Sequence, residues 1–374
     1  MIKKMYFGII AAILLLSVSD LLAQKMPMFK ANLQRTGVYE TKGIRKYTGV
    51  KWKLNMSSPI TTTCTVADNS VYFGCENGKL HAVDFRTGKL RWKFVTNKAI
   101  KSDPVVVNGI AYFGSDDGIF YAVETAKGSQ VWTFKTESNI ATTPIVTNGM
   151  IFFGSDDAYF YALKQETGEV IWKYKTDGNV AASPVFFENV IYFGANGYTK
   201  ATIYALNVKD GSELWKYDQI EGRVYATPSI AYGMLYIGNA EENPTATKNL
   251  LALDVKTGEV KWKVSNAFNI VSSASIVDGM LFIGIEDKFV YALDAKTGTE
   301  KWKFKTAAKV TASPVLSEGM VYIPGNDKLF YALDSKSGTV LWKHKSETNF
   351  TNSPTIDNGV IYIGAEDNYL YALY

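Results

Sequence analysis

The stretch YALDAKTGTEKWKF, residues 291–304, recurs with small changes about every forty residues along the chain. Each copy contains a variant of Ala-x-Asp-x-x-Thr-Gly-x-x-x-Trp, as in AVDFRTGKLRW from Ala82 and ALDVKTGEVKW from Ala252. Weaker copies, such as AVETAKGSQVW from Ala122, keep the Gly and the Trp. Because a fixed period of this kind is typical of repeat architectures, it takes precedence over chain length in counting domains.

All eight tryptophans occupy one position of the repeat, with successive spacings of 40, 40, 40, 43, 47, 40 and 40 residues. They are Trp52, Trp92, Trp132, Trp172, Trp215, Trp262, Trp302 and Trp342. Each interval divides into four short strands. The first ends in an Asn-Gly or Glu-Gly hairpin turn, the second is apolar on both faces, the third turns through Thr-Gly, and the fourth carries the Trp. Four-stranded units at this period predict a β-propeller.

The number of blades follows from the two ends of the chain. Seven complete units follow Trp52, and the last residues, up to Tyr374, supply three strands of another. The segment GVKWKL around Trp52 is the expected fourth strand. We therefore predict an all-β fold, an eight-bladed β-propeller of four-stranded blades, whose ring is closed by the N-terminal strand around Trp52. Closure removes the free sheet edges, and residues 49–374 then form a single domain.

The N-terminal residues 1–23 have the pattern of a cleaved secretory signal, with Lys3 and Lys4, an apolar run and small residues near Ala23. An uncleaved anchor is the alternative, although the apolar run is shorter than the ~20 residues of a spanning helix. No cysteine lies near the cleavage site, so lipid attachment there is not expected. Residues 24–48 are interpreted as a lead-in segment. The expected location is the periplasm or the extracellular medium.

The composition narrows the possible functions. Apolar residues make up 47% of the chain, which supports a large core, and the net charge of +4 is scattered, so nucleic acid is not an expected partner. No segment after the signal is apolar and long enough to span a membrane.

Cys64 and Cys75 fall in one predicted hairpin. An oxidising compartment permits a disulfide between them, but diagonal neighbours have poor geometry for one, so both states stay open.

The tryptophan repeat resembles that of the PQQ-repeat, or quinoprotein-like, β-propeller superfamily over residues 49–374. In size and N-terminal signal the chain is similar to the BamB-like outer-membrane assembly proteins. This resemblance implies an exported, non-enzymatic scaffold that uses a propeller face to contact proteins of the cell envelope, as a monomer or as a subunit of a complex. The alternative is a PQQ-dependent dehydrogenase-like enzyme or a propeller that binds a small ligand.

Few residues of the kind that supports catalysis are present. The resemblance implies that a dehydrogenase would hold PQQ and calcium near the axis, in many cases under a Cys-Cys pair, and this chain has no such pair. We expect no cofactor, with PQQ and calcium as the disfavoured alternative. His81 and His344 stand where other repeats have aromatic residues. They are interpreted as packing variants rather than as zinc ligands or catalytic bases.

Acidic residues recur in the turn between the second and third strands of several units. These turns contain Asp116-Asp117, Asp156-Asp157, Glu286-Asp287, Asp327 and Glu366-Asp367. Calcium or a cationic partner is one interpretation of a partial acidic ring. We favour the other, that Asp suits a tight turn.

Small residues near the start of the first strands, from Thr62 to Asn352, are expected to line an axial channel.

One sector departs from the repeat. Two neighbouring units have longer turns between the second and third strands, ANGYTKAT and NAEENPTATKNL. The loop between these units carries Arg223 and Tyr225, where another unit has Asn179 and Ala181. Long loops often carry function, and Arg and Tyr are frequent in binding hot spots. We predict partner contact at these positions, with drift in a tolerant loop as the alternative: Arg223, Tyr225, Tyr198, Glu241 and Glu242.

Overall fold

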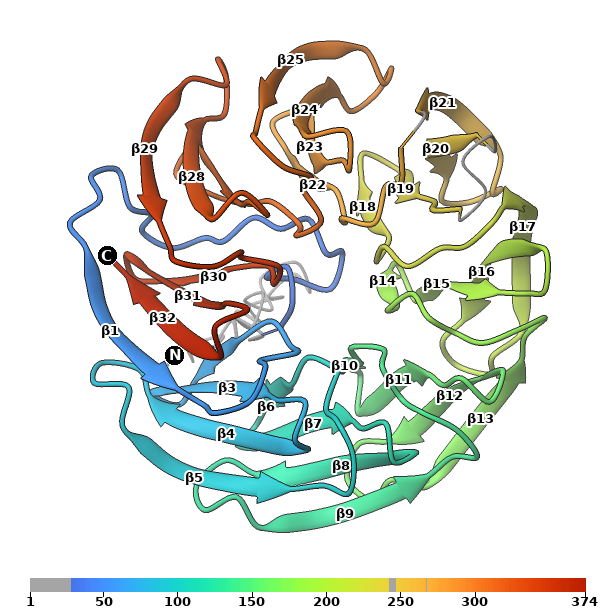
Figure 1. Cartoon of the computed structure of the whole chain (residues 1–374). Helices are drawn as coiled ribbons and strands as arrows, with labels where there is room; N and C mark the ends of the chain where they lie inside the picture. Colours follow the sequence, from blue (N-terminus) through green and yellow to red (C-terminus); the bar gives the residue numbers. More distant parts are fainter. Residues whose placement is uncertain (1–27, 242–246, 267) are drawn as a thin grey trace, which may run out of the picture.

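The computed structural model describes residues 28–241, 247–266 and 268–374. Within these ranges the chain forms eight four-stranded antiparallel sheets, arranged as blades around a central axis (Figure 1). The described ranges contain strands and no helix, and hence no helix that could cross a membrane. The prediction of an all-β, eight-bladed propeller is confirmed. The predicted signal, residues 1–23, lies outside the described residues.

Seven blades consist of four consecutive strands each, which follow one another from the axis outward. Blades 1 and 2 are β2 (Thr65–Ala67), β3 (Ser70–Gly74), β4 (Lys79–Asp84), β5 (Leu90–Val95), and β6 (Val105–Val107), β7 (Ile110–Gly114), β8 (Ile119–Glu124), β9 (Gln130–Lys135). Blades 3 and 4 are β10 (Ile145–Thr147), β11 (Met150–Gly154), β12 (Tyr159–Lys164), β13 (Val170–Lys175), and β14 (Val185–Phe187), β15 (Val190–Asn196), β16 (Lys200–Asn207), β17 (Glu213–Glu221). Blades 5 and 6 are β18 (Ser229–Ala231), β19 (Met234–Gly238), β20 (Lys248–Asp254), β21 (Val260–Asn266), and β22 (Ser275–Val277), β23 (Met280–Gly284), β24 (Phe289–Asp294), β25 (Glu300–Lys305). Blade 7 is β26 (Val315–Ser317), β27 (Met320–Pro324), β28 (Leu329–Asp334) and β29 (Val340–Lys345).

The eighth blade joins the two ends of the chain. Its inner strands are β30 (Thr355–Asp357), β31 (Val360–Gly364) and β32 (Tyr369–Leu373), and its outer strand is β1 (Val50–Asn55). Trp52 pairs with Ala372, and Leu54 pairs with Leu370. Figure 1 shows β1 beside β32, close to the C-terminus. The N-terminal strand therefore closes the ring as predicted.

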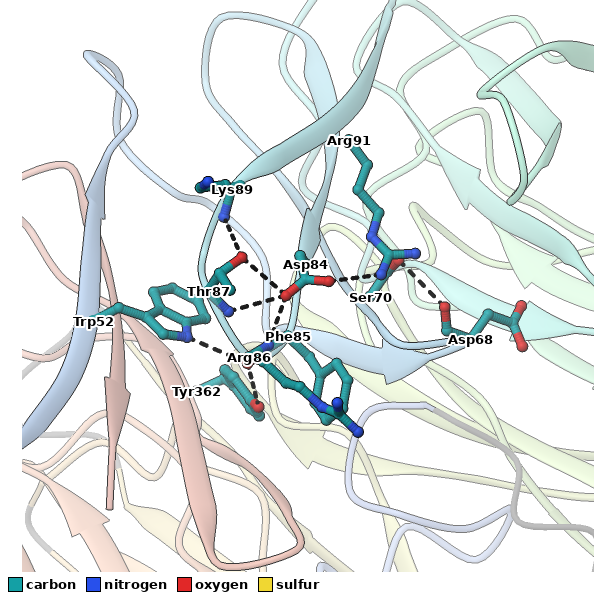
Figure 2. A network of polar contacts seen from close by, with 10 residues as sticks. All are labelled: Trp52, Asp68, Ser70, Asp84, Phe85, Arg86, Thr87, Lys89, Arg91 and Tyr362. Atoms are coloured by element: carbon teal, nitrogen blue, oxygen red, sulfur yellow. Dashed lines mark hydrogen bonds and ion pairs between the residues drawn. The ribbon is translucent and has the colours of Figure 1, made fainter.

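Seven of the eight tryptophans bond their blade to a turn of the next blade, as Figure 2 shows for Trp52. Its indole N–H donates to the carbonyl of Phe85 at 3.2 Å. Gly88 has φ +69°, and a Cβ there would lie 2.7 Å from the Trp52 ring. Asp84 stabilises the same turn by accepting from the Thr87 N–H at 3.0 Å, and it pairs with Arg91 at 2.7 Å. The Asp, Thr and Gly of the motif thus shape a turn with room for an indole.

Six more tryptophans repeat this arrangement, each with its indole N–H bonded to a carbonyl of the following blade. The pairs are Trp92–Thr125, Trp132–Gln165, Trp172–Val208, Trp215–Val255, Trp262–Ala295 and Trp302–Ser335. Trp342 has no such turn ahead of it, because blade 8 ends at the C-terminus. It donates instead to the carbonyl of Ile44 at 2.6 Å, and Tyr47 stacks on it at 5.1 Å. The lead-in segment replaces the missing turn.

Near the axis, adjacent blades are joined by a ring of side chains one residue before the Pro of most repeats. We call it the hydroxyl ring: Thr63, Asp103, Thr143, Ser183, Thr227, Ser273, Ser313 and Ser353. In six of the eight steps, a backbone N–H of one blade donates to the side chain of the next. Asp103 is the single carboxylate in this ring. These bonds provide acceptors for buried backbone N–H groups that lie outside the strands and have no partner within a sheet.

The predicted channel lining is wrong. Seven of the eight small residues, among them Thr62 and Thr142, are buried, and Asn352 is only partly exposed. The Thr142 hydroxyl both accepts from the Gly154 N–H at 2.9 Å and donates to the Gly154 carbonyl at 2.8 Å. We call residues 28–48 the axial segment: its first part, around Lys30 to Gly37, lies against the innermost strands at the axis, and its later part extends outward to Trp342. Its Lys30 and Arg35 side chains are fully buried.

Candidate functional site

The turns between the second and third strands share one face with the loops between blades, and we call it the loop face. In blade 2 the Asp116 N–H donates to the Ala99 carbonyl at 2.9 Å. In blade 5 Ala240 and Arg223 exchange two backbone bonds of 2.8 Å. Because every blade makes a backbone contact of this kind, side chains from both sets of loops surround one end of the axis.

The acidic turns are built into this framework. Asp117 accepts from the Tyr121 hydroxyl at 2.8 Å and from the Asn97 and Ile119 N–H groups at 3.0 Å each. Burial, then this carboxylate, raise the pKa of the Tyr121 hydroxyl above its usual value. The same Asp–Tyr bond recurs in four other turns, as Asp157–Tyr161, Asp287–Tyr291, Asp327–Tyr331 and Asp367–Tyr371. In blade 4 the tyrosine Tyr204 donates instead to Asp177, on the loop between β13 and β14. These carboxylates hold turns, in keeping with the interpretation that we favoured.

The remaining acids of these turns also have partners. Asp116 pairs with Lys101 at 2.7 Å, and Glu286 pairs with Lys309 at 3.1 Å. Over the described residues, no group of three or more His, Cys, Asp or Glu side chains is arranged to hold a metal ion. The loop face therefore offers no ready set of calcium ligands in the part of the chain that the structure describes.

The histidines pack as aromatic residues do. His81 stacks on Phe73 at 5.3 Å, and burial, with Lys79 and Lys93 nearby, lowers the pKa of His81 to about 4. His344 lies 2.7 Å from the Tyr47 hydroxyl, and burial lowers the pKa of His344 as well. A histidine held neutral by burial in this way is a poor proton carrier near neutral pH.

Both cysteines carry free thiols in this structure and are buried in one apolar cluster. Burial raises the pKa of the Cys75 thiol to about 12, and it raises that of Cys64 further. Thiols in such surroundings are poor nucleophiles, because the thiolate is the reactive form.

The irregular sector brings together most of the residues predicted for partner contact. Arg223 holds the Ala240 backbone of blade 5, while its guanidinium donates to the Gly197 carbonyl of blade 4 at 3.3 Å. It thus ties the two long turns together and positions them. The Glu241 N–H donates to the Asn269 side chain at 3.0 Å, which extends the chain of contacts to blade 6. Glu242 lies outside the described residues.

Aromatic side chains stand exposed on this sector. Tyr198 is 98% exposed and Tyr225 is 53% exposed. Phe268, on the loop into blade 6, is 51% exposed, and it is absent from the residues predicted for partner contact. The signal was available, because the equivalent loops carry small or polar residues such as Ser138 and Ala308. Exposed aromatic groups of this size are a common feature of protein contact sites.

The family follows from the sequence comparison. A family model described as "Outer membrane protein assembly factor BamB" matches residues 47–147, 139–279 and 286–374. The chain belongs to this family. No curated protein matches the sequence.

Solved structures share the fold at low sequence identity. BamB from Moraxella catarrhalis is 16% identical, with a TM-score of 0.70, and the match covers 88% of this chain and 99% of that one. Quinohemoprotein alcohol dehydrogenase from Comamonas testosteroni is 15% identical, with a TM-score of 0.79, covering 94% and 80%. The computationally designed Ika8 protein is 18% identical, with a TM-score of 0.76, covering 87% and 100%. At these identities the likeness shows the fold alone.

The axial residues do not fit a quinone cofactor with calcium. The centre of the ring is filled by the Lys30 and Arg35 side chains, and the guanidinium of Arg35, whose pKa is lowered by burial only to about 10, would repel a divalent cation. Asp103 is the nearby carboxylate, and it already accepts from the Thr63 N–H at 2.7 Å and the Thr143 hydroxyl at 2.9 Å. No step of a dehydrogenase reaction follows from these residues.

Proposed function

We propose that the protein is an exported, non-enzymatic scaffold of the cell envelope that binds a protein partner through the irregular sector of its loop face. The contact surface consists of Tyr198, Tyr225 and Phe268, positioned by the loops that Arg223 joins. Membership in the BamB family supports a role in envelope or outer-membrane protein assembly. The scaffold works without PQQ or calcium.

The observation that carries this proposal is the exposure of large aromatic side chains in the one sector where the loops are long. Tyr198 is 98% exposed, so its ring makes almost no contact within the chain. Burying such a ring against a partner releases water from a large apolar area, and the hydroxyl can still form a hydrogen bond. The Arg223 contacts hold Gly197 and Ala240 in place before binding, which reduces the entropy lost on association.

The test is a cross-linking pull-down of the tagged protein from its native cell envelope. We compare the wild type with a Tyr198→Ala/Tyr225→Ala double variant. Tyr232→Ala is the matched control, since Tyr232 is also exposed, at 49%, but lies in the turn between β18 and β19 on the opposite face. We expect the double variant to lose at least about tenfold of the recovered partner, as for two hot-spot residues.

Two results would count against the proposal. Equal recovery by the wild type and the double variant would show that the aromatic residues are not the contact. Equal loss in the Tyr232→Ala control would place the contact elsewhere. Far-ultraviolet circular dichroism of each variant shows whether the propeller is intact before recoveries are compared.

A further inference from the structure

Eight backbone carbonyls encircle the axis, one from the residue directly before the innermost strand of each blade. They belong to Cys64, Pro104, Pro144, Pro184, Pro228, Ala274, Pro314 and Pro354. Where the innermost strand begins with Ser or Thr, its hydroxyl donates to the carbonyl of the next blade. Thr65 bonds to Pro104 at 2.6 Å and Ser229 to Ala274 at 2.7 Å, and Ser275 and Thr355 do the same.

Four blades lack this donor, because β6, β10, β14 and β26 begin with Val105, Ile145, Val185 and Val315. The first two of these blades are adjacent, and the carbonyls that they leave without a hydroxyl donor are those of Pro144 and Pro184. Arg35 supplies both bonds, from Nη2 to Pro144 at 3.1 Å and from Nε to Pro184 at 3.4 Å. Its remaining terminal nitrogen, Nη1, donates to the carbonyl of Phe29 at 2.7 Å. One guanidinium therefore replaces two missing hydroxyls.

We propose that the centre of the propeller contains a guanidinium-binding site, formed by the carbonyls of Pro144 and Pro184 with the charge of Asp103, and that Arg35 is its internal ligand, which latches the axial segment across the axis. A planar guanidinium suits this site because its fixed fork of donors reaches two carbonyls at once. The amino group of Lys30, by contrast, bonds to the single carbonyl of Ala274, which lies directly before the innermost strand of blade 6.

The surroundings of Arg35 indicate that the latch is specific. Arg35 and Lys30 have φ values of +54° and +57°, in the left-handed region that side chains with a Cβ rarely adopt. Such conformations persist only where surrounding contacts enforce them. Arg35 is fully buried. Burial lowers the pKa of its guanidinium, and the negative charge of Asp103 partly offsets this effect. A buried charge is weak evidence for stability, but it can specify one arrangement over others.

The latch determines where the axial segment lies along the ring. Next to Arg35, the segment accepts backbone bonds from the innermost strands of successive blades. The Phe186 N–H donates to Leu33 at 3.0 Å, Ile230 to Gln34 at 2.9 Å, and Ile276 to Thr36 at 2.8 Å. If Arg35 is removed, we expect these three amides to lose their partners while the blades themselves stay folded.

Hydrogen exchange of the Phe186, Ile230 and Ile276 amides tests the latch, with chemical rescue by guanidinium chloride. In Arg35→Ala, we expect exchange at these amides to accelerate at least about tenfold, and about 10 mM guanidinium chloride to restore most of the protection. Sodium chloride at the same ionic strength should restore none. Arg45→Ala is the matched control, because Arg45 is an exposed arginine of the same segment with one bond to a carbonyl.

Arg35→Lys covers the case in which Arg35→Ala does not fold. It keeps the charge but removes the fork, so it should also accelerate exchange at the three amides. Protection equal to wild type in Arg35→Lys would overturn the guanidinium site. So would a loss of protection in Arg35→Ala that guanidinium does not reverse, or that Arg45→Ala reproduces.

Discussion

Asp103 is the one acid among the hydroxyl side chains that join adjacent blades near the axis. It is nearly buried, at 9% exposure, and its carboxylate accepts from both neighbouring blades. Burial raises the pKa of Asp103 to about 6, more than the hydrogen bonds and Arg35 lower it. The folded protein therefore holds a proton on Asp103 at a pH where the unfolded chain has lost it.

This pKa predicts a pH dependence of stability. A carboxyl group with a raised folded pKa contributes stability as the pH falls, between about 6 and its unfolded value near 4. Over that window, the unfolding free energy of the wild type should rise relative to Asp103→Asn by roughly 3 kcal/mol. Urea unfolding of both proteins at several pH values measures the difference. Burial lowers the pKa of His81, so its titration changes stability in the opposite direction, but it does so equally in both proteins and cancels in their difference. Parallel pH curves of the two proteins would contradict a raised pKa of Asp103.

Gly88 shows how one residue connects two blades. Its φ is +69°, and an added Cβ would lie 2.7 Å from the Trp52 ring, whereas Gly149 has φ +72° and no atom within 4 Å of an added Cβ. Gly149→Ala should cost only about 1 kcal/mol, from backbone strain. Gly88→Ala adds displacement of the indole, so we expect a cost of roughly 3 kcal/mol or more. Similar unfolding free energies for the two variants would show that Trp52 docking tolerates a methyl group.

At the scale of elements, β1 performs two tasks that lie far apart in sequence. It pairs with β32 along its length and places Trp52 against the turn of blade 1. The axial segment before it offers Trp342 the carbonyl of Ile44. Without residues 24–55, β32 would present an unpaired edge, blade 1 would lose the docked Trp52, and Trp342 would lose the carbonyl of Ile44.

Removal of residues 24–55 should therefore lower the melting temperature by roughly 10 °C or more, or abolish cooperative melting. Scanning calorimetry of the truncated and full-length proteins measures this. A Lys51→Ala/Lys53→Ala variant serves as the control, because it changes only outward side chains of β1 and should melt within about 2 °C of the wild type. A truncated protein that melts with the full chain would disprove closure by the N-terminus.

At the scale of the whole molecule, the ring has one plugged axis and one uneven face. The axial segment fills the centre with Lys30 and Arg35, while Tyr198, Tyr225 and Phe268 project from the loop face over blades 4 to 6. The protein thus departs from eightfold symmetry in two places. In our proposals, the axial segment is latched across the axis by Arg35, and the irregular sector of the loop face binds a partner.

The plugged axis predicts the response to cofactor. Addition of PQQ with calcium should leave the tryptophan fluorescence of the wild type unchanged, apart from the linear absorption effect that free tryptophan also shows. The measurement is a titration at constant protein concentration. Saturable quenching would contradict the non-enzymatic proposal and direct attention to the mouth of the axis near Tyr225.

The sequence by itself determined the blades, their number and their closure. These features depend on local patterns, namely hydrophobic period, turn residues such as the Gly before each tryptophan, and a count of strands. The irregular sector was also visible, since loop lengths and the residues at Arg223 and Tyr225 can be compared between repeats. The exposure of its side chains could not be read this way, whereas Phe268 could have been found by the same comparison of loops.

Only the tertiary structure decided what fills the axis. In the sequence Arg35 looks like a surface residue of an irregular segment, yet it is fully buried and bonds to Pro144 and Pro184, more than 100 residues away. Its partners are backbone carbonyls, which leave no mark in the residue pattern. They converge on one point only when the ring closes, and the Arg35 guanidinium there bonds to two adjacent carbonyls that receive no hydroxyl from Val105 and Ile145.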